Sequence, residues 1–404
     1  MRRGVRTAVR SVAALTSVAV LAGAGQLWAL QQRLGSEIVT SRAAIPTPRP
    51  TPAGREFTAL LVGLDARTDA NGNPLPPALL DAMHAGPDEG QLHTDTIILL
   101  HVPAAAGEPA VAVSIPRDSF VPIAGGHGTH KINTAYRWGM EDAADALGAQ
   151  GVTGAEQDRR AREAGRRTLV ATVEDLTGAG IDHYAEINMA GFVELTEALG
   201  GVPVCLNQPV RDSYSGVDLP AGEHLVSGAG ALAFVRQRHG LADGDLDRIA
   251  RQQAFAAALA QRLMSGGTLT DPASLQRLVG VVTRHVVLDA GWNLDQAIGQ
   301  IHRLSGDDLL FRTVPIERLD LRTPVDGIAV EIDRDAVRRF VQDAFAGSGA
   351  VSAAPTPAPT AVSRTDAPQA PVTARPAGTP RPTGAATATS TAPVITAGGV
   401  PCVD

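Results

Sequence analysis

Arginine side chains are concentrated between residues 231 and 253 of the chain. An apolar run at 231–235 predicts a short strand, so Arg236 and Arg238 after it would point to the same side. Two guanidinium groups about 6 Å apart in an effective dielectric of about 20 repel by roughly 3 kcal/mol. A bound anion would relieve this repulsion, and guanidinium groups match phosphate oxygens especially well.

A helix is predicted to follow from about Leu246, with Asp245 of the preceding Asp-Gly-Asp turn as its N-cap. Residues three and four apart share one side of a helix, which groups Arg248, Arg251 and Gln252. Arginine is unfavourable near a helix N terminus, because the helix dipole is already positive there. The segment therefore predicts an anion site, with phosphate as the favoured ligand. The alternative is a solvated basic surface neutralised by the neighbouring aspartates.

Charged residues also stand at the ends of three apolar runs, 57–64, 96–102 and 110–115, which predict buried strands. If these strands pair antiparallel in chain order, the end of the first, the start of the second and the end of the third meet at one edge. The residues expected at that edge are Asp65, Asp95, Arg117 and Asp118. Two carboxylates beside several arginines indicate a divalent cation and a polyphosphate. The alternative is that strand ends simply carry polar residues.

Motifs for other chemistries are missing from the sequence. It contains neither a Walker nor a dinucleotide-binding glycine pattern, and Ser114 lacks the Gly-x-Ser-x-Gly context of a nucleophile elbow. His127 and His130 lie in a glycine-rich loop, where a metal role is an alternative to a structural one. The net charge of −7 and an aromatic content of 3% disfavour nucleic-acid binding, which usually needs basic patches and stacking rings.

The elements that must position these residues alternate between strands and helices, which predicts a sheet covered by helices. Further strands are expected at 184–188, 202–206, 309–316 and 328–332. Helices are expected from 131 onward and at 156–177, 191–199, 271–288, 293–304 and 333–345. Residues 68–92, rich in Gly, Pro, Asn and Asp, are expected to form a long loop.

The two ends of the chain differ in composition from the middle. Residues 11–30 carry no charge and follow an arginine-rich segment at 1–10, which predicts a single transmembrane anchor with the N terminus inside the cell and the body outside. A signal peptide cleaved near Ala24 is the alternative. Residues 31–54 read as a proline-rich linker, 55–346 as an extracellular domain, and 347–404 as a disordered tail rich in Ala, Pro and Thr.

The chain has two cysteines, Cys205 and Cys402, which excludes a site made of several thiolate ligands. In an exported protein they could pair, and a bridge would then fasten the C-terminal tail to the folded body. Two unrelated thiols are the alternative.

Six motifs, in order, resemble those of the LytR-CpsA-Psr proteins. They are Gly63-Leu-Asp-Ala-Arg67, Thr94-Asp-Thr96, Ser114-Ile-Pro-Arg-Asp118, Lys131-Ile-Asn133, Arg236-Gln-Arg238 and Asp247-Arg-Ile-Ala-Arg-Gln252, within a core of 57–263. Thr94 stands where the family often has Ser, and the loop at 68–92 is longer than in many members. The resemblance implies an α/β domain in which helices cover both sides of a central mixed sheet.

That resemblance also implies a phosphotransferase of the Gram-positive cell envelope. Such proteins move a glycopolymer phosphate from a polyprenyl-pyrophosphate-linked donor at the membrane to a muramic acid hydroxyl of peptidoglycan. A phosphodiester forms and polyprenyl phosphate leaves, so the donor supplies the energy. The lipid would lie in an apolar tunnel. The glycopolymer could be a teichoic acid, an arabinogalactan or a capsule.

The same resemblance implies roles for individual residues. Asp65 and Asp95 would hold Mg²⁺ or Mn²⁺. The pyrophosphate would be bound by Arg67, Arg117, Lys131, Arg236, Arg238, Arg248 and Gln252. The residues expected to act in catalysis are Arg117, Asp118, Arg238 and Arg248, and the candidate general bases are Asp118 and Asp95.

Two other functions stay open on the sequence. The same site could deliver water and act as a lipid pyrophosphatase, or the protein could bind the wall or regulate without catalysis. The non-catalytic alternative predicts no dependence on Mg²⁺ or on the two aspartates. A DNA-binding regulator is disfavoured by the outward topology and the acidic net charge.

Overall fold

The computed structural model describes residues 38–42, 44–45, 55–86, 90, 92–105, 107–237, 245–264, 271–292, 309–346, 395–396 and 401–403. The N-terminal segment expected at 1–10, the anchor expected at 11–30, most of the linker, the helix expected at 293–304 and most of the tail lie outside these ranges. Within them, every helix is too short or too polar to span a bilayer.

A mixed sheet of eight strands runs through the centre of the described residues, in the order β1-β12-β7-β2-β3-β4-β13-β16. In chain order they are β1 (Val39–Ser41), β2 (Phe57–Asp65), β3 (His93–Val102), β4 (Ala110–Ser114), β7 (His183–Asn188), β12 (Val286–Asp289), β13 (Leu309–Thr313) and β16 (Ile395–Thr396). Strands β2, β3 and β4 pair antiparallel in chain order, as predicted. Strand β7 runs parallel to β2 on its other side.

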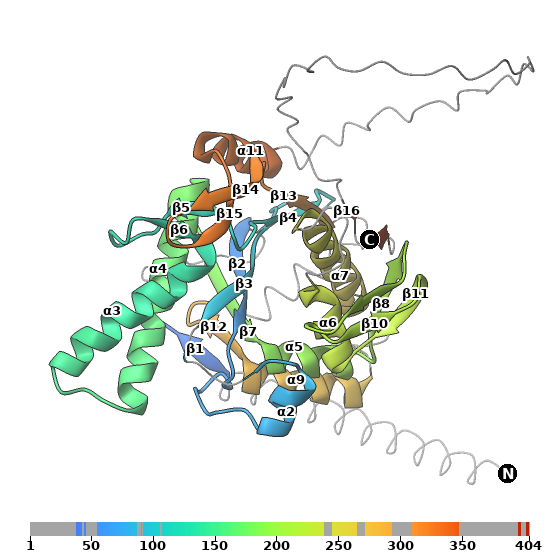
Figure 1. The fold of residues 1–404 in the computed structure, drawn as a ribbon, viewed down its shortest axis with the longest axis horizontal. Helices are drawn as coiled ribbons and strands as arrows, with labels where there is room; N and C mark the ends of the chain where they lie inside the picture. Colours follow the sequence, from blue (N-terminus) through green and yellow to red (C-terminus); the bar gives the residue numbers. More distant parts are fainter. Residues whose placement is uncertain are drawn as a thin grey trace, which may run out of the picture.

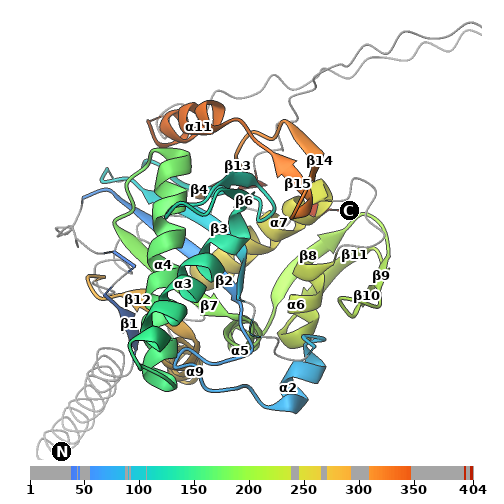
Figure 2. The same cartoon turned by 60° about the vertical axis from the view of Figure 1, so that its left-hand side comes forward.

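Helices cover both faces of this sheet, as Figures 1 and 2 show. One face is covered by α3 (Ala135–Ala149), α4 (Ala155–Thr177) and α11 (Arg334–Ala346). The helices on the other face are α5 (Met189–Ala198), α6 (Gly228–Arg236), α7 (Asp245–Met264) and α9 (Pro272–His285). Alternate residues of β2 serve the two sides, because Leu60 and Val62 join the core under α4 while Ala59 joins the core under α7. The predicted architecture is therefore confirmed.

The strand predicted at 231–235 is wrong, because these residues belong to helix α6. Ala231 and Phe234 lie three apart and pack in the core with α7, whereas Leu232 and Val235 pack toward α5. Both of these faces of α6 are covered by other helices, so residues 231–235 are all apolar. They lack the pattern of polar residues that would distinguish a helix from a strand. Helix α7 begins at Asp245, one residue before the predicted start.

Short elements fill several predicted loops. Helix α2 (Pro77–Ala82) lies within the loop expected at 68–92. The hairpins are β5–β6 (Phe120–Pro122, Thr129–Lys131), β9–β10 (Val210–Asp212, Val217–Leu219) and β14–β15 (Arg318–Thr323, Gly327–Glu331). A 3₁₀ turn, η1 (Ile132–Thr134), precedes α3, so the helix expected from 131 begins later. The helix expected to reach 288 ends at His285 and continues directly as β12.

The C-terminal end of the chain is part of the fold. Strand β17 (Cys402–Val403) pairs with β8 (Val202–Leu206), which β11 (Gly222–Val226) borders on its other side. Cys205 and Cys402 form a disulfide with 4.3 Å between their Cα atoms. The expectation of a wholly disordered tail is thus wrong for 395–396 and 401–403, because a covalent bond and strand pairing hold them.

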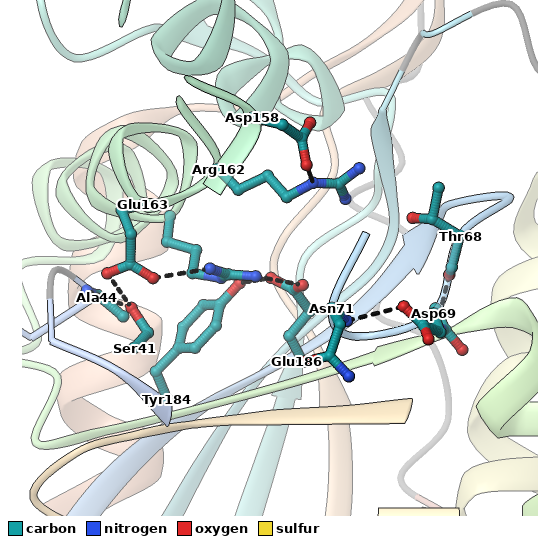
Figure 3. A network of polar contacts seen from close by, with 12 residues as sticks. Ser41, Ala44, Thr68, Asp69, Asn71, Asp158, Arg162, Glu163, Tyr184 and Glu186 are labelled. Carbon is teal, nitrogen blue, oxygen red and sulfur yellow. Dashed lines mark hydrogen bonds and ion pairs between the residues drawn. The ribbon is translucent and has the colours of Figure 1, made fainter. Parts of the chain in front are cut away.

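A buried ion pair between Arg166 and Glu186 links α4 to strand β7 of the sheet. Figure 3 shows Glu186 together with its neighbours Tyr184 and Glu163. The Arg166 guanidinium donates from Nε and Nη2 to the two carboxylate oxygens of Glu186, both at 3.0 Å, and Tyr184 Oη donates to Glu186 at 2.7 Å. Burial alone would raise the pKa of Glu186, but the Arg166 charge and these hydrogen bonds lower it below its ordinary value. Glu163 extends the network by accepting from Ser41 of β1 at 2.9 Å.

Candidate active site

A pocket of about 330 Å³ opens at the edge where β2 and β7 end and β3 begins. Its polar lining includes Asp65, Asp95, Arg117, Arg236, Arg248 and Gln252. Its apolar lining comes mainly from β7, α5 and α6 and includes Ile187, Met189, Phe192, Leu232 and Val235. Charged and apolar surfaces therefore meet in one cavity.

The two aspartates reach the pocket through an irregular pairing of β2 with β3. Gly63 pairs with Thr96 and Leu64 with Thr94, so Asp95 is an extra residue in β3. Such a bulge re-aims a side chain at the end of a ladder. Gly63 favours the close approach, because a Cβ there would lie 3.0 Å from the Thr96 Cβ, a tight contact. The predicted meeting of the strand ends is confirmed.

The carboxyl group of Asp65 lies in an environment that disfavours its charge. Burial raises its pKa above the ordinary value, and the charge of Asp95 raises it further, whereas Arg67, Arg236 and Arg117 lower it in part. Arg67 Nη1 lies 3.3 Å from Asp65 Oδ1. The repulsion between the two carboxylates would be relieved by a cation between them.

Arg117 and Asp118 follow β4 and connect the acids to α7. Burial lowers the pKa of Arg117, but the neighbouring charges of Asp95, Asp118 and Asp65 outweigh this and raise it above its ordinary value. Arg117 forms an ion pair with Asp95. Asp118 is contacted by three cations, Arg117 Nε at 3.6 Å, Lys131 Nζ at 3.6 Å and Arg248 Nη2 at 3.8 Å.

Helices α6 and α7 supply further polar groups. Arg248 is 4% exposed and lies one helical turn before Gln252, which donates to the Val235 carbonyl oxygen at 3.3 Å. Arg251 does not join them. Its guanidinium is fully buried, donates to Gln237 and lies over the Phe234 ring at 5.5 Å. The predicted grouping of three side chains therefore holds for two of them. Arg238 lies outside the described residues.

The other predicted residues lie behind the pocket wall. Arg67 touches Asp65, and Lys131 touches Asp118, without either lining the cavity. His127 and His130 are packed on Trp138, each with its ring centre 5.3 Å away. Neither lines the pocket, and the described part of the chain contains no group of three or more side chains suited to a metal ion. The structural role is thus the better interpretation of the two histidines.

The pocket also has lining that the sequence analysis missed. Asp212, Tyr214 and Ser215 come from the β9–β10 hairpin. The segment 83–85 braces two arginines, because Arg236 Nη1 donates to the Met83 carbonyl at 3.3 Å and Arg67 Nη2 to the Ala85 carbonyl at 2.6 Å. The Asp-Ser-Tyr-Ser-Gly run signals a turn, but a turn signal does not say what lies beside it.

Comparison with known proteins gives several related cell-wall proteins. The chain is 44% identical over 287 residues to the cell wall biosynthesis protein LcpA of Corynebacterium glutamicum, covering 71% of this chain and 55% of LcpA. It is 39% identical over 213 residues to the probable cell wall biosynthesis protein LcpB of that organism, covering 53% and 43% of the two chains. The chain thus spans about half the length of these relatives.

A third relative carries a more specific name. It is the polyisoprenyl-teichoic acid–peptidoglycan teichoic acid transferase TagU of Halalkalibacterium halodurans, 30% identical over 240 residues, covering 59% of this chain and 64% of TagU. 

Solved structures share the fold. TagV of B. subtilis superimposes with a TM-score of 0.51 at 21% identity, covering 72% of this chain and 98% of TagV. A LytR-Csp2A-Psr enzyme from Actinomyces oris gives a TM-score of 0.50 at 20% identity, covering 76% and 95%. Similarity at this identity speaks for the architecture alone.

The profile of the LytR_cpsA_psr family matches residues 36–333. This range includes the whole pocket lining and every motif singled out in the sequence. Since the match covers more than half of the chain, the protein belongs to the LytR_cpsA_psr family, the LytR-CpsA-Psr proteins.

Proposed function

We propose that this protein transfers a glycopolymer phosphate from a polyprenyl-pyrophosphate-linked donor to a muramic acid hydroxyl of peptidoglycan. The observation that carries the proposal is one pocket in which Asp65 and Asp95 share space with Arg117, Arg236 and Arg248 beside an apolar wall. Diphosphate needs the charged groups, and a prenyl chain needs the apolar ones. The similarity to TagU, a polyisoprenyl-teichoic acid–peptidoglycan teichoic acid transferase, favours the same chemistry, and the similarity to LcpA favours a role in cell wall biosynthesis.

The two aspartates fit a resident Mg²⁺ or Mn²⁺. Mg²⁺ takes one or two protein carboxylates and completes its shell with water and phosphate oxygens. Asp65 and Asp95 both line the pocket, and the pKa of Asp65 is raised first by burial and then by the charge of Asp95. The bound ion would supply charge neutralisation at the diphosphate oxygens.

The arginines would hold the diphosphate and stabilise the leaving group. The acceptor hydroxyl oxygen attacks the phosphorus that bears the glycan, and the bond from that phosphorus to the bridging oxygen breaks. Polyprenyl phosphate leaves with the electron pair, and the hydroxyl proton passes to a base. Fixed guanidinium groups stabilise the charge on the leaving oxygen. Arg117, Arg236 and Arg248 line the pocket and can play this role, with Gln252 beside them.

Asp118 is better suited to positioning than to proton transfer. It contacts Arg117, Lys131 and Arg248 and does not line the cavity. Of the two candidate bases, Asp95 is the one that reaches the pocket. A donor embedded in the membrane also requires the domain at 55–346 to work at the outer face of the cell membrane, which agrees with the anchor predicted at 11–30.

The test is incubation of the purified protein and Mg²⁺ with a labelled lipid-linked donor, with and without peptidoglycan. Label that appears in peptidoglycan through a phosphodiester supports transfer. Release of phosphorylated glycan at the same rate in both arms would instead identify a lipid pyrophosphatase. Absence of turnover in both arms, in a protein that still binds peptidoglycan, would identify a wall-binding protein.

A further inference from the structure

Tyr214 is an exposed aromatic residue at the opening of the pocket. The described residues include three tyrosines, of which Tyr136 and Tyr184 are fully buried, whereas Tyr214 is 75% exposed and still lines the cavity. A ring that is exposed and also lines a pocket is accessible to a ligand, with an apolar face and a polar hydroxyl to offer it.

The turn that presents Tyr214 is ordered by its own hydrogen bonds. Asp212 Oδ1 accepts from the Tyr214 backbone N–H at 2.9 Å, and the Asp212 carbonyl accepts from Gly216 N–H at 2.8 Å. Gly216 has a φ of +84°, which favours glycine. Strands β9 and β10 pair on either side of this turn, and β10 runs beside α6 (Figure 2). Because the turn is already ordered, binding of a ligand to the Tyr214 ring would cost little further backbone entropy.

The turn is also fixed relative to the arginines. A Cβ at Gly216 would lie 2.9 Å from the His84 ring, so the two segments are in close contact. His84 stands between Met83 and Ala85, whose carbonyls accept from Arg236 and Arg67. The segment 83–85 therefore contacts both the hairpin turn and two arginines, of which Arg236 lines the pocket together with Tyr214.

We propose that Tyr214 stacks on the sugar ring joined to the diphosphate of the donor. This inference rests on the proposed function and adds a saccharide subsite to it. A pyranose ring offers a face of C–H groups to an aromatic ring and hydroxyls to the phenol, so tyrosine matches both. The prenyl chain has its own surface in Phe192, Leu232 and the other apolar lining, and it gains nothing from a phenol at the solvent edge.

The experiment compares two ligands by calorimetry in the presence of Mg²⁺, geranylgeranyl diphosphate and its N-acetylglucosamine conjugate. Tyr214→Ala should bind the sugar conjugate about tenfold more weakly, which is the loss expected for one aromatic anchor. Its affinity for geranylgeranyl diphosphate should change by less than about twofold. Tyr214→Trp should keep the preference for the sugar. Val325→Ala is the matched control, because Val325 is 79% exposed and lies outside the pocket lining.

The outcomes separate the inference from the proposed function. If Tyr214→Ala weakens both ligands equally, or neither, the saccharide subsite is wrong while the diphosphate site stands. If the substitution raises only the KM for peptidoglycan in the transfer assay, the stacked sugar belongs to the acceptor and the assignment to the donor is wrong. If the unsubstituted protein binds neither ligand, the proposed function fails and the inference with it.

Discussion

Arg117 forms an ion pair with Asp95 at the edge of the central sheet, one strand end against the bulge of its neighbour. The pair joins the two kinds of charge on which the proposed chemistry depends. Without ligands, Arg117 compensates an acid that would otherwise face Asp65. With diphosphate and a divalent cation bound, the arginine and the acid would each have a second partner of opposite charge.

Arg248 should contribute mainly to stabilising the leaving phosphate. Arg248→Ala is expected to lower kcat by about 10²-fold or more, the usual cost of removing one preorganised donor. Arg248→Lys should recover only part of this, because a lysine keeps the charge but loses the guanidinium fork. Arg322→Ala, on an exposed position of β14, is the matched control. Equal rates of Arg248→Ala and Arg322→Ala in the transfer assay would contradict this role.

The charged carboxylate of Asp65 should lower the free energy of unfolding of the metal-free protein. Because its pKa is raised in the fold above the ordinary value of 3.8, its favourable contribution is present at low pH and is lost as pH rises through the folded pKa. At pH 7 without divalent cations, Asp65→Asn should therefore melt at a higher temperature than the unsubstituted protein.

Added Mg²⁺ should reverse this order, since a ligand that binds only the folded state stabilises it. Asp320→Asn, at an exposed position of β14, should show the same metal response as the unsubstituted protein. The order of melting temperatures, measured by calorimetry with and without Mg²⁺, checks both statements. An unchanged order would count against a cation at Asp65.

The Arg166–Glu186 pair should matter for stability and not for the pocket. Glu186→Gln leaves the buried Arg166 guanidinium with Glu163, which is partly exposed, as its one remaining carboxylate partner among the described residues, and should cost about 3 kcal/mol of unfolding free energy. The folded pKa of Glu186 is lowered, so its contribution is present above the ordinary pKa of 4.5 and is lost as pH falls through the lowered value. Denaturant titrations at pH 7 and at pH 3 should therefore show a smaller difference between variant and unsubstituted protein at pH 3.

The Cys205–Cys402 disulfide should stabilise the attachment of the C-terminal strand. It closes a loop with a sequence separation of 197, and bridges of this kind contribute about 2–5 kcal/mol. Cys402→Ser should lower the melting temperature under oxidising conditions and abolish the effect of a reductant on it. A melting temperature that a reductant leaves unchanged in the unsubstituted protein would show that the bridge does not form.

The sequence was enough to bring Asp65, Asp95 and Arg117 together at one end of the sheet. This prediction needed only the ends of three strands and their antiparallel pairing in chain order. It misplaced Arg251, which was expected to share one side of the helix with Arg248. Spacing alone does not reveal that the Arg251 side chain packs against Phe234 and Gln237. Helix α6 was predicted as a strand at 231–235, because this segment is apolar throughout and shows no helical periodicity.

Tyr214 could not be found in advance for a related reason. Its turn residues specify a local shape, and the contact of Gly216 with His84 joins segments that are distant in the chain. The pocket opening is thus a tertiary property, whereas the acidic edge of the sheet follows from topology.

The central claim is that one pocket binds a divalent cation and a polyprenyl diphosphate together. The most direct measurement is a crystal structure of the protein with geranylgeranyl diphosphate and Mg²⁺. The account predicts diphosphate density in contact with Arg236 and Arg248, a cation between it and Asp65 or Asp95, and the prenyl chain along Phe192 and Leu232. Diphosphate bound elsewhere, with this pocket holding only water, would contradict it.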